Sequence, residues 1–437
     1  MNRADDIHSL LSFLAVEPLA DKGIFRRAIT QPIKNGDEIG LTRLRACMGC
    51  VSLRRSKNIV DLKLVEKEVD LCSVVWPNDA HKKLYDALFG TLRTAMEAIF
   101  REGDESAVLK NYSSIFEKLL RLRQTCCSGT LVSPERRQVA LKMWDDVKTQ
   151  STVKKLTAKE GLALLEKLKC TFTEVNHSLP ECGICLTEME ETDCTILKGC
   201  GHVFCKICIQ QVLAKSNQCC PYCRESFTKA DIIEKSVAAT AASAKQGESD
   251  EIKCSSDDDF GTPPKILALL EAIKSMKPDE KGVVFSQFTK YLDLIEKAMK
   301  DAGHSFVRID GSFSAKQRIS NIHQFNSQEQ SPRFILCSLL AAGTGINLTR
   351  GNHAFMMDCW WNVATENQAM DRIHRIGQKR KVKITRFVMK DSVEERIVEL
   401  QETKSLQAKG LLQKLKGDEK RKALLGDLKG LLELNEE

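Results

Sequence analysis

The nine residues Cys200-Gly201-His202-Val203-Phe204-Cys205-Lys206-Ile207-Cys208 decide how the middle of this chain folds. A further pair of cysteines with a two-residue gap flanks them on each side. The complete set of potential metal ligands is Cys182, Cys185, Cys200, His202, Cys205, Cys208, Cys220 and Cys223. A two-residue gap lets two thiolates close on one tetrahedral Zn²⁺, and Cys200 with His202 completes two sets of four ligands. The spacing therefore predicts two structural zinc ions in a small module.

The competing interpretation is a disulfide framework, which requires an oxidising compartment. The chain opens with Met-Asn-Arg-Ala-Asp-Asp, which has mixed charge and no apolar run of the kind that a secretory signal contains. The longest uncharged stretch, residues 334–349, is too short and too rich in glycine to span a bilayer. We therefore expect zinc, a reducing compartment and no membrane partner.

The composition is that of an ordinary soluble protein, with 42% hydrophobic and 29% charged residues. A length of 437 residues can hold about two to four domains. The net charge of +7 is a weak indication of polyanion binding, and a solvated surface explains it equally well.

The chain has 18 cysteines, which is more than the zinc module uses. Cys47 and Cys50 form another C-x-x-C pair, but no second pair lies close to them in the sequence. Cys126 and Cys127 are adjacent. We interpret all four as buried small apolar residues on helices.

Hydrophobic periodicity divides the chain into segments. Residues 5–132 have a helical pattern, in which Leu84, Leu88 and Leu92 recur at the spacing of one helix face. The predicted organisation is 1–132, helix-rich; 133–179, a helical connector; 180–227, the zinc module; 228–262, a short helix at 229–234 and an acidic Ala/Ser-rich linker; 263–408, an α/β domain; and 409–437, an amphipathic helical tail. The composition of residues 236–259 cannot bury a core, so we expect a solvated linker rather than a phosphorylation switch.

Short apolar runs alternate with helical stretches in the α/β segment. The predicted strands are 283–285, 306–309, 334–337, 354–357 and 384–388. Helices fit between them, for example at 290–302 and 314–325. Buried strands separated by helices favour a parallel sheet with crossover helices.

Four motifs occur in order within this segment. They are Val284–Phe288, Arg308–Ser312, Ala342–Leu348 and Gln368–Gln378. This series resembles the second RecA-like lobe of Swi/Snf-type DNA-dependent ATPases, and the last motif, Q-A-x-D-R-x-H-R-x-G-Q, is the most specific. Three earlier stretches, Leu10–Leu14, Leu53–Lys57 and Leu119–Gln124, look like the tail of the first lobe in the same family. The implied fold is multidomain α/β, with RecA-like lobe 2, a zinc module and a helical remnant of lobe 1.

In that family the two lobes hold ATP between them, which implies roles for three residues. Phosphoryl transfer develops charge that a guanidinium can stabilise. The resemblance makes Arg375 the arginine finger and gives Arg372 and Gln368 nucleotide contacts. We expect both arginines on one face of a helix, three residues apart. The alternative is that they are surface salt-bridge partners.

Two motifs of the first lobe do not occur in the chain. No glycine is followed by lysine, so a G-x-x-x-x-G-K-[ST] phosphate loop is absent, and no D-E-x-H sequence occurs. The chain looks like the carboxyl-terminal part of a larger ATPase or a truncated gene product. ATP and Mg²⁺ are expected to bind only if the other lobe is supplied. Leu340 also replaces a lysine that the family places near DNA, and Trp360 and Trp361 are expected to be packing residues.

The zinc module resembles a RING finger, whose cross-braced pattern implies two ligand groups. The first group is Cys182, Cys185, Cys205 and Cys208. The second group is Cys200, His202, Cys220 and Cys223, with Cys219 as a rival ligand. By the same resemblance Ile184, Pro221 and Arg224 would contact a ubiquitin-charged conjugating enzyme. The alternative is a zinc-stabilised docking domain without ligase activity.

A RING finger between the two lobes is typical of the subfamily of the helicase-like transcription factor and its post-replication-repair relatives. The resemblance implies a RING ubiquitin ligase within a DNA-dependent ATPase, a double-stranded DNA partner and a nuclear location. The alternative is a non-catalytic scaffold that binds proteins or DNA. The sequence leaves the oligomeric state open.

Overall fold

The computed structural model describes residues 4–34, 37–52, 64–76, 79–103, 108, 112–153, 156–170, 194–197, 203–213, 227–234, 260–327, 331–342, 345–410 and 417–434. The chain forms two compact units. The N-terminal unit comprises Met1–Leu64 and Gln413–Ala423, and the larger unit comprises Val65–Leu412 and Leu424–Glu437.

The N-terminal unit is helical. Its elements are α1 (Ala4–Phe13), α2 (Lys22–Phe25), a π-helical turn (Arg26–Thr30), α3 (Gln31–Lys34) and α4 (Glu38–Val51). They pack around Leu11, Phe25 and Ile29. Cys47 and Cys50 both lie on α4, where Cys47 is half-buried and Cys50 is exposed. The predicted burial is therefore wrong for Cys50.

The larger unit contains a six-stranded parallel sheet. Its strands are β1 (Lys67–Val74), β5 (Gly282–Ser286), β6 (Phe306–Ile309), β7 (Phe334–Ser338), β8 (His353–Met356) and β9 (Val382–Met389). The order across the sheet is β1-β9-β8-β5-β7-β6, and every pair is parallel. Every residue of β5 and β7 is buried, as expected for strands covered on both faces. The five strands predicted from the sequence are confirmed.

Strand β1 was not predicted, and the helical interpretation of residues 67–74 is wrong. β1 pairs along its full length with β9, and Val69 lies opposite Ile384. Val69 and Leu71 stay exposed while Val74 is buried, so this strand lacks the continuous apolar run that marks its neighbours. Pairing with a strand far away in the sequence outweighs the local pattern.

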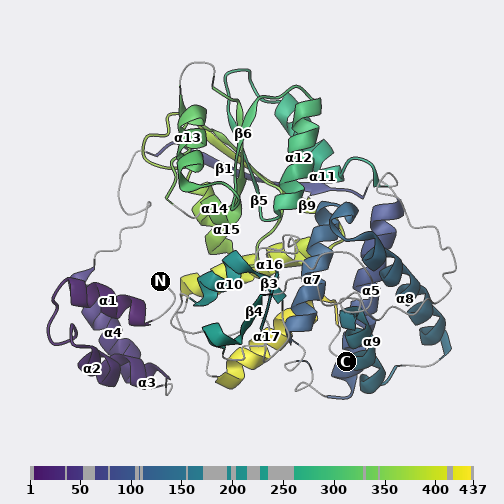
Figure 1. The fold of residues 1–437 in the computed structure, drawn as a ribbon, viewed down its shortest axis with the longest axis horizontal. Helices are drawn as coiled ribbons and strands as arrows, with labels where there is room; N and C mark the ends of the chain where they lie inside the picture. Colours follow the sequence, from purple (N-terminus) through teal and green to yellow (C-terminus); the bar gives the residue numbers. More distant parts are fainter. Residues whose placement is uncertain are drawn as a thin grey trace. The chain divides into compact units, whose positions relative to one another are not determined.

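Alternate residues of the central strand enter two different cores. Val284 belongs to one cluster, while Val283 and Phe285 belong to the other. The helices that flank the sheet are α11 (Pro264–Lys274), α12 (Thr289–Asp301), α13 (Ala315–Asn326), α14 (Leu339–Ala342), α15 (Val363–Met370) and α16 (Val393–Gly410). Figure 1 shows α11 and α12 on one side of the strands and α13, α14 and α15 on the other. The two clusters are therefore the two covered faces of the sheet.

Three helices extend the first of these cores, namely α5 (Asp79–Arg101), α7 (Tyr112–Cys127) and α9 (Ala158–Cys170). A fourth helix, α8 (Pro134–Val153), has its buried Ala140 in a smaller cluster with Leu84 of α5. α5 packs against the other three. Gly90 on α5 leaves room for Trp144 on α8, because a Cβ at position 90 would lie 2.1 Å from the indole ring. Leu92 and Leu122 share one cluster with sheet residues such as Val284, so these helices are continuous with the lobe.

The zinc module is described in part. It contains β2 (Cys194–Leu197), β3 (Val203–Cys205), α10 (Lys206–Leu213) and β4 (Ile232–Glu234), with the antiparallel strand order β3-β2-β4. The helix predicted at 229–234 is wrong. Thr228 and Asp231 form a capping box around one 3-10 turn, and the β-branched pair Ile232-Ile233 then continues as strand β4. The predicted acidic linker at 236–259 lies outside the described residues.

The chain continues after α16 with α17 (Gly417–Leu431), within the predicted helical tail. Among the helices that the structure describes, none combines the length and the apolar character needed to cross a membrane.

Candidate functional site

Two of the eight predicted zinc ligands lie among the described residues. Cys205 ends β3 and Cys208 lies in the first turn of α10, so the turn between strand and helix places both thiols on the same side. The backbone N–H of Cys208 donates to Sγ of Cys205 at 3.4 Å, and both side chains are buried. The other predicted ligands and partner contacts lie outside the described residues. They are Cys182, Cys185, Cys200, His202, Cys220, Cys223, Ile184, Pro221 and Arg224.

The described residues contribute a small apolar cluster beside these thiols. It consists of Leu197, Phe204, Ile209 and Phe227 together with the two cysteines, and Oγ1 of Thr195 donates to the carbonyl of Phe204 at 2.6 Å. A module of the predicted length, residues 180–227, usually needs a metal or disulfides for stability. Two cysteine thiols separated by two residues are ligands that zinc prefers, so the donor pair that the described residues present fits zinc.

The three predicted nucleotide-contacting residues lie on and after α15. Gln368 is on the helix and is exposed. The helix ends at Met370, and Arg372 and Arg375 follow in a succession of turns that we call the arginine loop (residues 371–378). The prediction that both arginines lie on one face of a helix is therefore wrong. Gly377, with φ +99°, adopts a conformation that L residues rarely take and ends the loop.

The arginine loop is held at several points. The N–H of Leu348 donates to the carbonyl of Arg372 at 3.1 Å. Nε2 of Gln378 donates to the carbonyl of Gly351 at 2.8 Å, and Ile373 is completely buried. Arg375 itself is exposed, and its side chain makes no ion pair with the described residues. Within the described residues, the loop thus presents the guanidinium of Arg375 at the surface from an anchored backbone.

Arg123 is a residue that sequence reasoning did not single out. It lies on α7, and its Nη2 donates to Oε1 of Gln287 at 2.7 Å and to the carbonyl of Cys359. Nη2 lies 3.9 Å from Oδ1 of Asp358, and both side chains are fully buried. The other carboxylate oxygen of Asp358 accepts from Oγ of Ser286 at 2.5 Å. A cation is thereby held at the carboxyl ends of β5 and β8.

Trp360 and Trp361, which follow β8, flank the guanidinium of Arg123. The guanidinium carbon of Arg123 is 5.5 Å from the ring centre of Trp360 and 5.2 Å from that of Trp361. Trp360 also donates its backbone N–H to Glu366 on α15 at 2.6 Å. The two rings pack against a buried arginine, in agreement with the packing role predicted for them. The signal in the sequence was an arginine next to the buried Leu122, within the apolar periodicity of α7.

A second buried ion pair joins α11 to α16. Nζ of Lys265 lies 2.6 Å from Oε2 of Glu394, and neither side chain is exposed. Burial alone would lower the pKa of Lys265, but the charge of Glu394 outweighs it and raises that pKa. Cys126 and Cys127 lie nearby and are buried, as predicted. Desolvation raises the pKa of both thiols well above the ordinary value.

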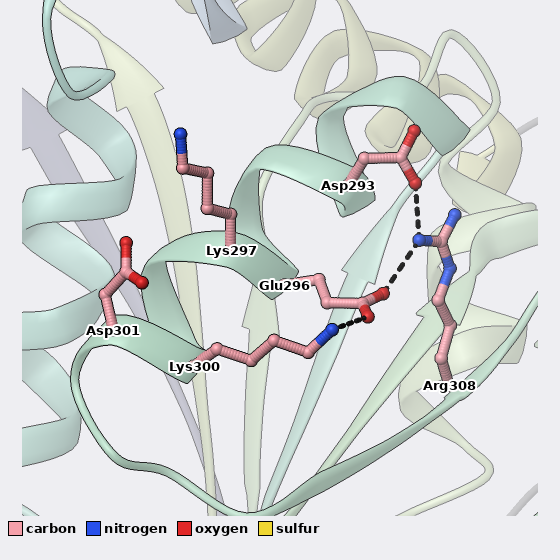
Figure 2. A pocket seen from close by; sticks show the side chains of 6 residues that line it. All are labelled: Asp293, Glu296, Lys297, Lys300, Asp301 and Arg308. Carbon is pink, nitrogen blue, oxygen red and sulfur yellow. Dashed lines mark hydrogen bonds and ion pairs between the residues drawn. The ribbon is translucent and has the colours of Figure 1, made fainter.

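A charged hollow of about 460 Å³ opens beside α12 (Figure 2). It is lined by Asp293, Glu296, Lys297, Lys300, Asp301 and Arg308. Arg308 pairs with Glu296 at 3.0 Å and with Asp310 at 2.7 Å, and Lys300 pairs with Glu296 at 2.7 Å. Burial would raise the pKa of Asp310, but hydrogen bonds from Ser312 and the charge of Arg308 hold it below its usual value. Arg308 and Lys300 thus pair with the carboxylates beside them, and no predicted site residue lines the hollow.

Three family models match the chain. The SNF2-related domain matches residues 1–131, the Ring finger domain matches residues 180–224, and the Helicase conserved C-terminal domain matches residues 264–377. A RING finger implies zinc binding.

Curated relatives match nearly the whole chain. The Helicase-like transcription factor of Homo sapiens is 34% identical over 99% of this chain and 42% of its own length. The DNA repair protein RAD5A of Arabidopsis thaliana is 33% identical over 94% of this chain and 39% of its own length. The chain thus spans less than half the length of these relatives. The solved C-terminal part of the Fun30 ATPase domain has a TM-score of 0.45 and 20% identity, covering 84% of this chain and 97% of that chain.

The chain therefore combines an SNF2-related domain, a RING finger and a helicase C-terminal domain, and its homologues are helicase-like transcription factors and RAD5 DNA repair proteins, which confirms the subfamily that the motifs indicated.

Proposed function

We propose that this chain is a RING-type ubiquitin ligase module within the C-terminal half of a Swi/Snf-type DNA-dependent ATPase that acts in DNA repair or on chromatin. The observation that carries the proposal is the buried thiol pair Cys205 and Cys208, joined by an N–H···S hydrogen bond inside a segment that matches a RING finger. Nuclear residence and a double-stranded DNA partner follow from the same family.

Two zinc ions would be held in the cross-braced arrangement. Cys205 and Cys208 would share one ion with Cys182 and Cys185. The second ion would bind Cys200, His202, Cys220 and Cys223. Zinc supplies folding free energy here, because structural zinc ions replace the large core that a module of this size lacks.

The proposed ligase chemistry is catalysis by positioning. An acceptor amine attacks the thioester carbonyl of the charged conjugating enzyme, an amide bond forms, and the enzyme's cysteine leaves as a thiol. The RING finger forms no covalent intermediate and holds the thioester in a reactive pose. Ile184 and Pro221 would contact the conjugating enzyme, and Arg224 would hydrogen-bond to both the enzyme and ubiquitin.

A discharge assay tests this proposal. Purified chain is added to a panel of ubiquitin-charged conjugating enzymes with free lysine, and loss of the thioester is followed with time. We expect stimulation by the wild-type chain and at least about tenfold less with Ile184→Ala, because positioning of the thioester supplies the rate enhancement. Ile319→Ala is the matched control, since Ile319 is an exposed isoleucine on α13. Absence of stimulation by the wild-type chain would favour the non-catalytic scaffold instead.

The helicase part is proposed to contribute Arg375 as an arginine finger, with Arg372 and Gln368 as nucleotide contacts, once a first lobe is supplied. The exposure of Arg375 on an anchored loop supports this role. Because the sequence has no Gly-Lys phosphate loop, we expect the isolated chain to release phosphate from ATP at background rate. DNA-stimulated phosphate release that Arg375→Ala abolishes would contradict this.

A further inference from the structure

The residue next to Arg375 forms a hydrogen bond to a distant part of the chain. Nε2 of His374 lies 2.9 Å from the carbonyl oxygen of Val65, 309 residues away in the sequence. The imidazole is almost fully buried, with 9% of His374 exposed. A carbonyl oxygen can only accept, so the ring nitrogen donates and the bond fixes the tautomer of His374.

Val65 is the first residue of the larger unit, directly after Leu64, which ends the first segment of the N-terminal unit. Its side chain packs against the cluster that contains Ile373. The next carbonyl, that of Glu66, accepts from the N–H of Val382 at 3.0 Å. Two successive carbonyls therefore fix the chain where it leaves the N-terminal unit, and His374 holds the first of them.

On the other side of the bond is the arginine loop. His374 lies between buried Ile373 and exposed Arg375, and its N–H donates to the carbonyl of Met370 at 3.0 Å. Leu348 and Gln378 hold the loop from the remainder of the lobe, as described above. Among the hydrogen bonds described above that hold the arginine loop, the one from His374 joins it to the residues just before β1.

We propose that His374 is a positioning residue that couples the backbone of Arg375 to the chain segment arriving from the N-terminal unit. A displacement of that segment moves the carbonyl of Val65, and the hydrogen bond transmits it to the arginine loop. Coupling between two positions is reciprocal, so a displacement of the backbone at Arg375 also displaces Val65. The role of Arg375 as an arginine finger rests on the proposed function. The coupling between Val65 and the arginine loop does not.

The alternative role for His374 is to fill space in the core. The two roles predict different variants to be tolerated. His374→Phe keeps a ring of similar shape but has no donor. His374→Gln keeps an N–H donor that can take the place of Nε2 but has no ring. His323→Gln is the matched control, because His323 is an exposed histidine on α13 of the same lobe.

Hydrogen exchange of the full chain, followed by mass spectrometry, tests the coupling. Two segments report on it, residues 65–70 and residues 371–376. For His374→Phe and His374→Ala we expect exchange to rise by about fivefold in both segments, the change that loss of one buried hydrogen bond produces. Exchange in β5 and β7 should not change. His374→Gln and His323→Gln should exchange like the wild type.

Each other result overturns the proposal. Exchange that rises in only one of the two segments would show that they are not coupled. If the amide exchange rates of His374→Phe equal those of the wild type, or if they rise in His374→Gln, the role of His374 is packing. A rise that extends to β5 and β7 would show general destabilisation. None of these readouts requires ligase or ATPase activity, so failure of the proposed function leaves the test intact.

Discussion

Arg123 and Asp358 form an ion pair in which both side chains are fully buried, at a distance of 3.9 Å between Nη2 and Oδ1. Arg123 lies within the SNF2-related match, and Asp358 lies within the helicase C-terminal match. α7 thus lies in the segment that matches the SNF2-related domain. Its buried Arg123 nevertheless completes a polar network in the segment that matches the helicase C-terminal domain. The part of the SNF2-related match that contains α7 therefore belongs to the same compact unit as the helicase C-terminal match.

Arg123→Met is expected to destabilise the larger unit by about 3–5 kcal/mol, because removing one partner leaves the carboxylate of Asp358 buried without its cation. Urea unfolding followed by tryptophan fluorescence measures the change, since Trp360 and Trp361 flank the guanidinium. Arg93→Met is the control, because Arg93 pairs with Glu97 at the surface. A loss of less than about 1 kcal/mol for Arg123→Met, the value of a surface pair, would contradict the assigned role.

Gly90→Ala is expected to destabilise the packing of α5 on α8 by about 1–3 kcal/mol, because the added Cβ would lie 2.1 Å from the Trp144 ring. Truncating the ring in the double variant Gly90→Ala/Trp144→Leu should recover part of this loss. In Gly426→Ala, on the exposed side of α17, a Cβ meets nothing within 4 Å. That control should gain about 0.5–1 kcal/mol from helix propensity alone. Equal thermal unfolding midpoints for the two single variants would be incompatible with the contact.

His81 predicts a dependence of stability on pH. Burial lowers the pKa of this imidazole to about 4 in the folded chain, against an ordinary value of 6.5. The unfolded state therefore binds the proton more readily between these values. Stability from this group is complete above pH 6.5 and is lost as the pH falls toward about 4, by roughly 3 kcal/mol in total.

The measurement is the free energy of unfolding of wild type and His81→Leu at several pH values from 7 to 4.5. The free energy of unfolding of the wild type, relative to that of His81→Leu, should fall steadily on acidification. Only the wild type must keep a neutral imidazole buried against Phe260. His323→Gln, which changes an exposed histidine, should follow the wild type. A difference that stays constant with pH would refute the assignment.

Metal analysis of the purified chain is expected to return two zinc ions per molecule. Cys205→Ser should lose at least one of them and unfold the module, since structural zinc contributes on the order of 10 kcal/mol to folding. Cys50→Ser is the control, because Cys50 is exposed on α4, and it should retain both ions. Full zinc content in Cys205→Ser would exclude that residue as a ligand.

The clearest strands that the sequence predicted are β5 and β7. Each is a short apolar run that is buried on both faces, and burial of that kind can be read from hydrophobicity alone. β1 has the sequence Lys-Glu-Val-Asp-Leu-Cys-Ser-Val, with exposed Val69 and Leu71, and it becomes a strand only through its pairing with β9. Its register depends on residues more than 300 positions away, which no local pattern contains.

The candidate site divides in the same way. The spacing of Cys205 and Cys208 predicted two converging thiols, because ligand spacing is a local property. The positions of Arg372 and Arg375 were expected from helical periodicity, but α15 ends at Met370 and positive φ at Gly377 reverses the backbone. The role of Arg123 could not be predicted from the sequence, because tertiary packing alone determines which partners a charge on an apolar helix face contacts.

The pairing of β1 with β9 also governs the order of assembly. The ring nitrogen of Trp76, just after β1, donates to the carbonyl of Lys390, just after β9, across 314 residues of sequence. On the ribosome the first of these strands emerges long before the second and must wait unpaired while the zinc module and most of the lobe are synthesised. In a nascent chain, β1 and β9 should thus pair only after nearly the whole polypeptide has emerged from the ribosome.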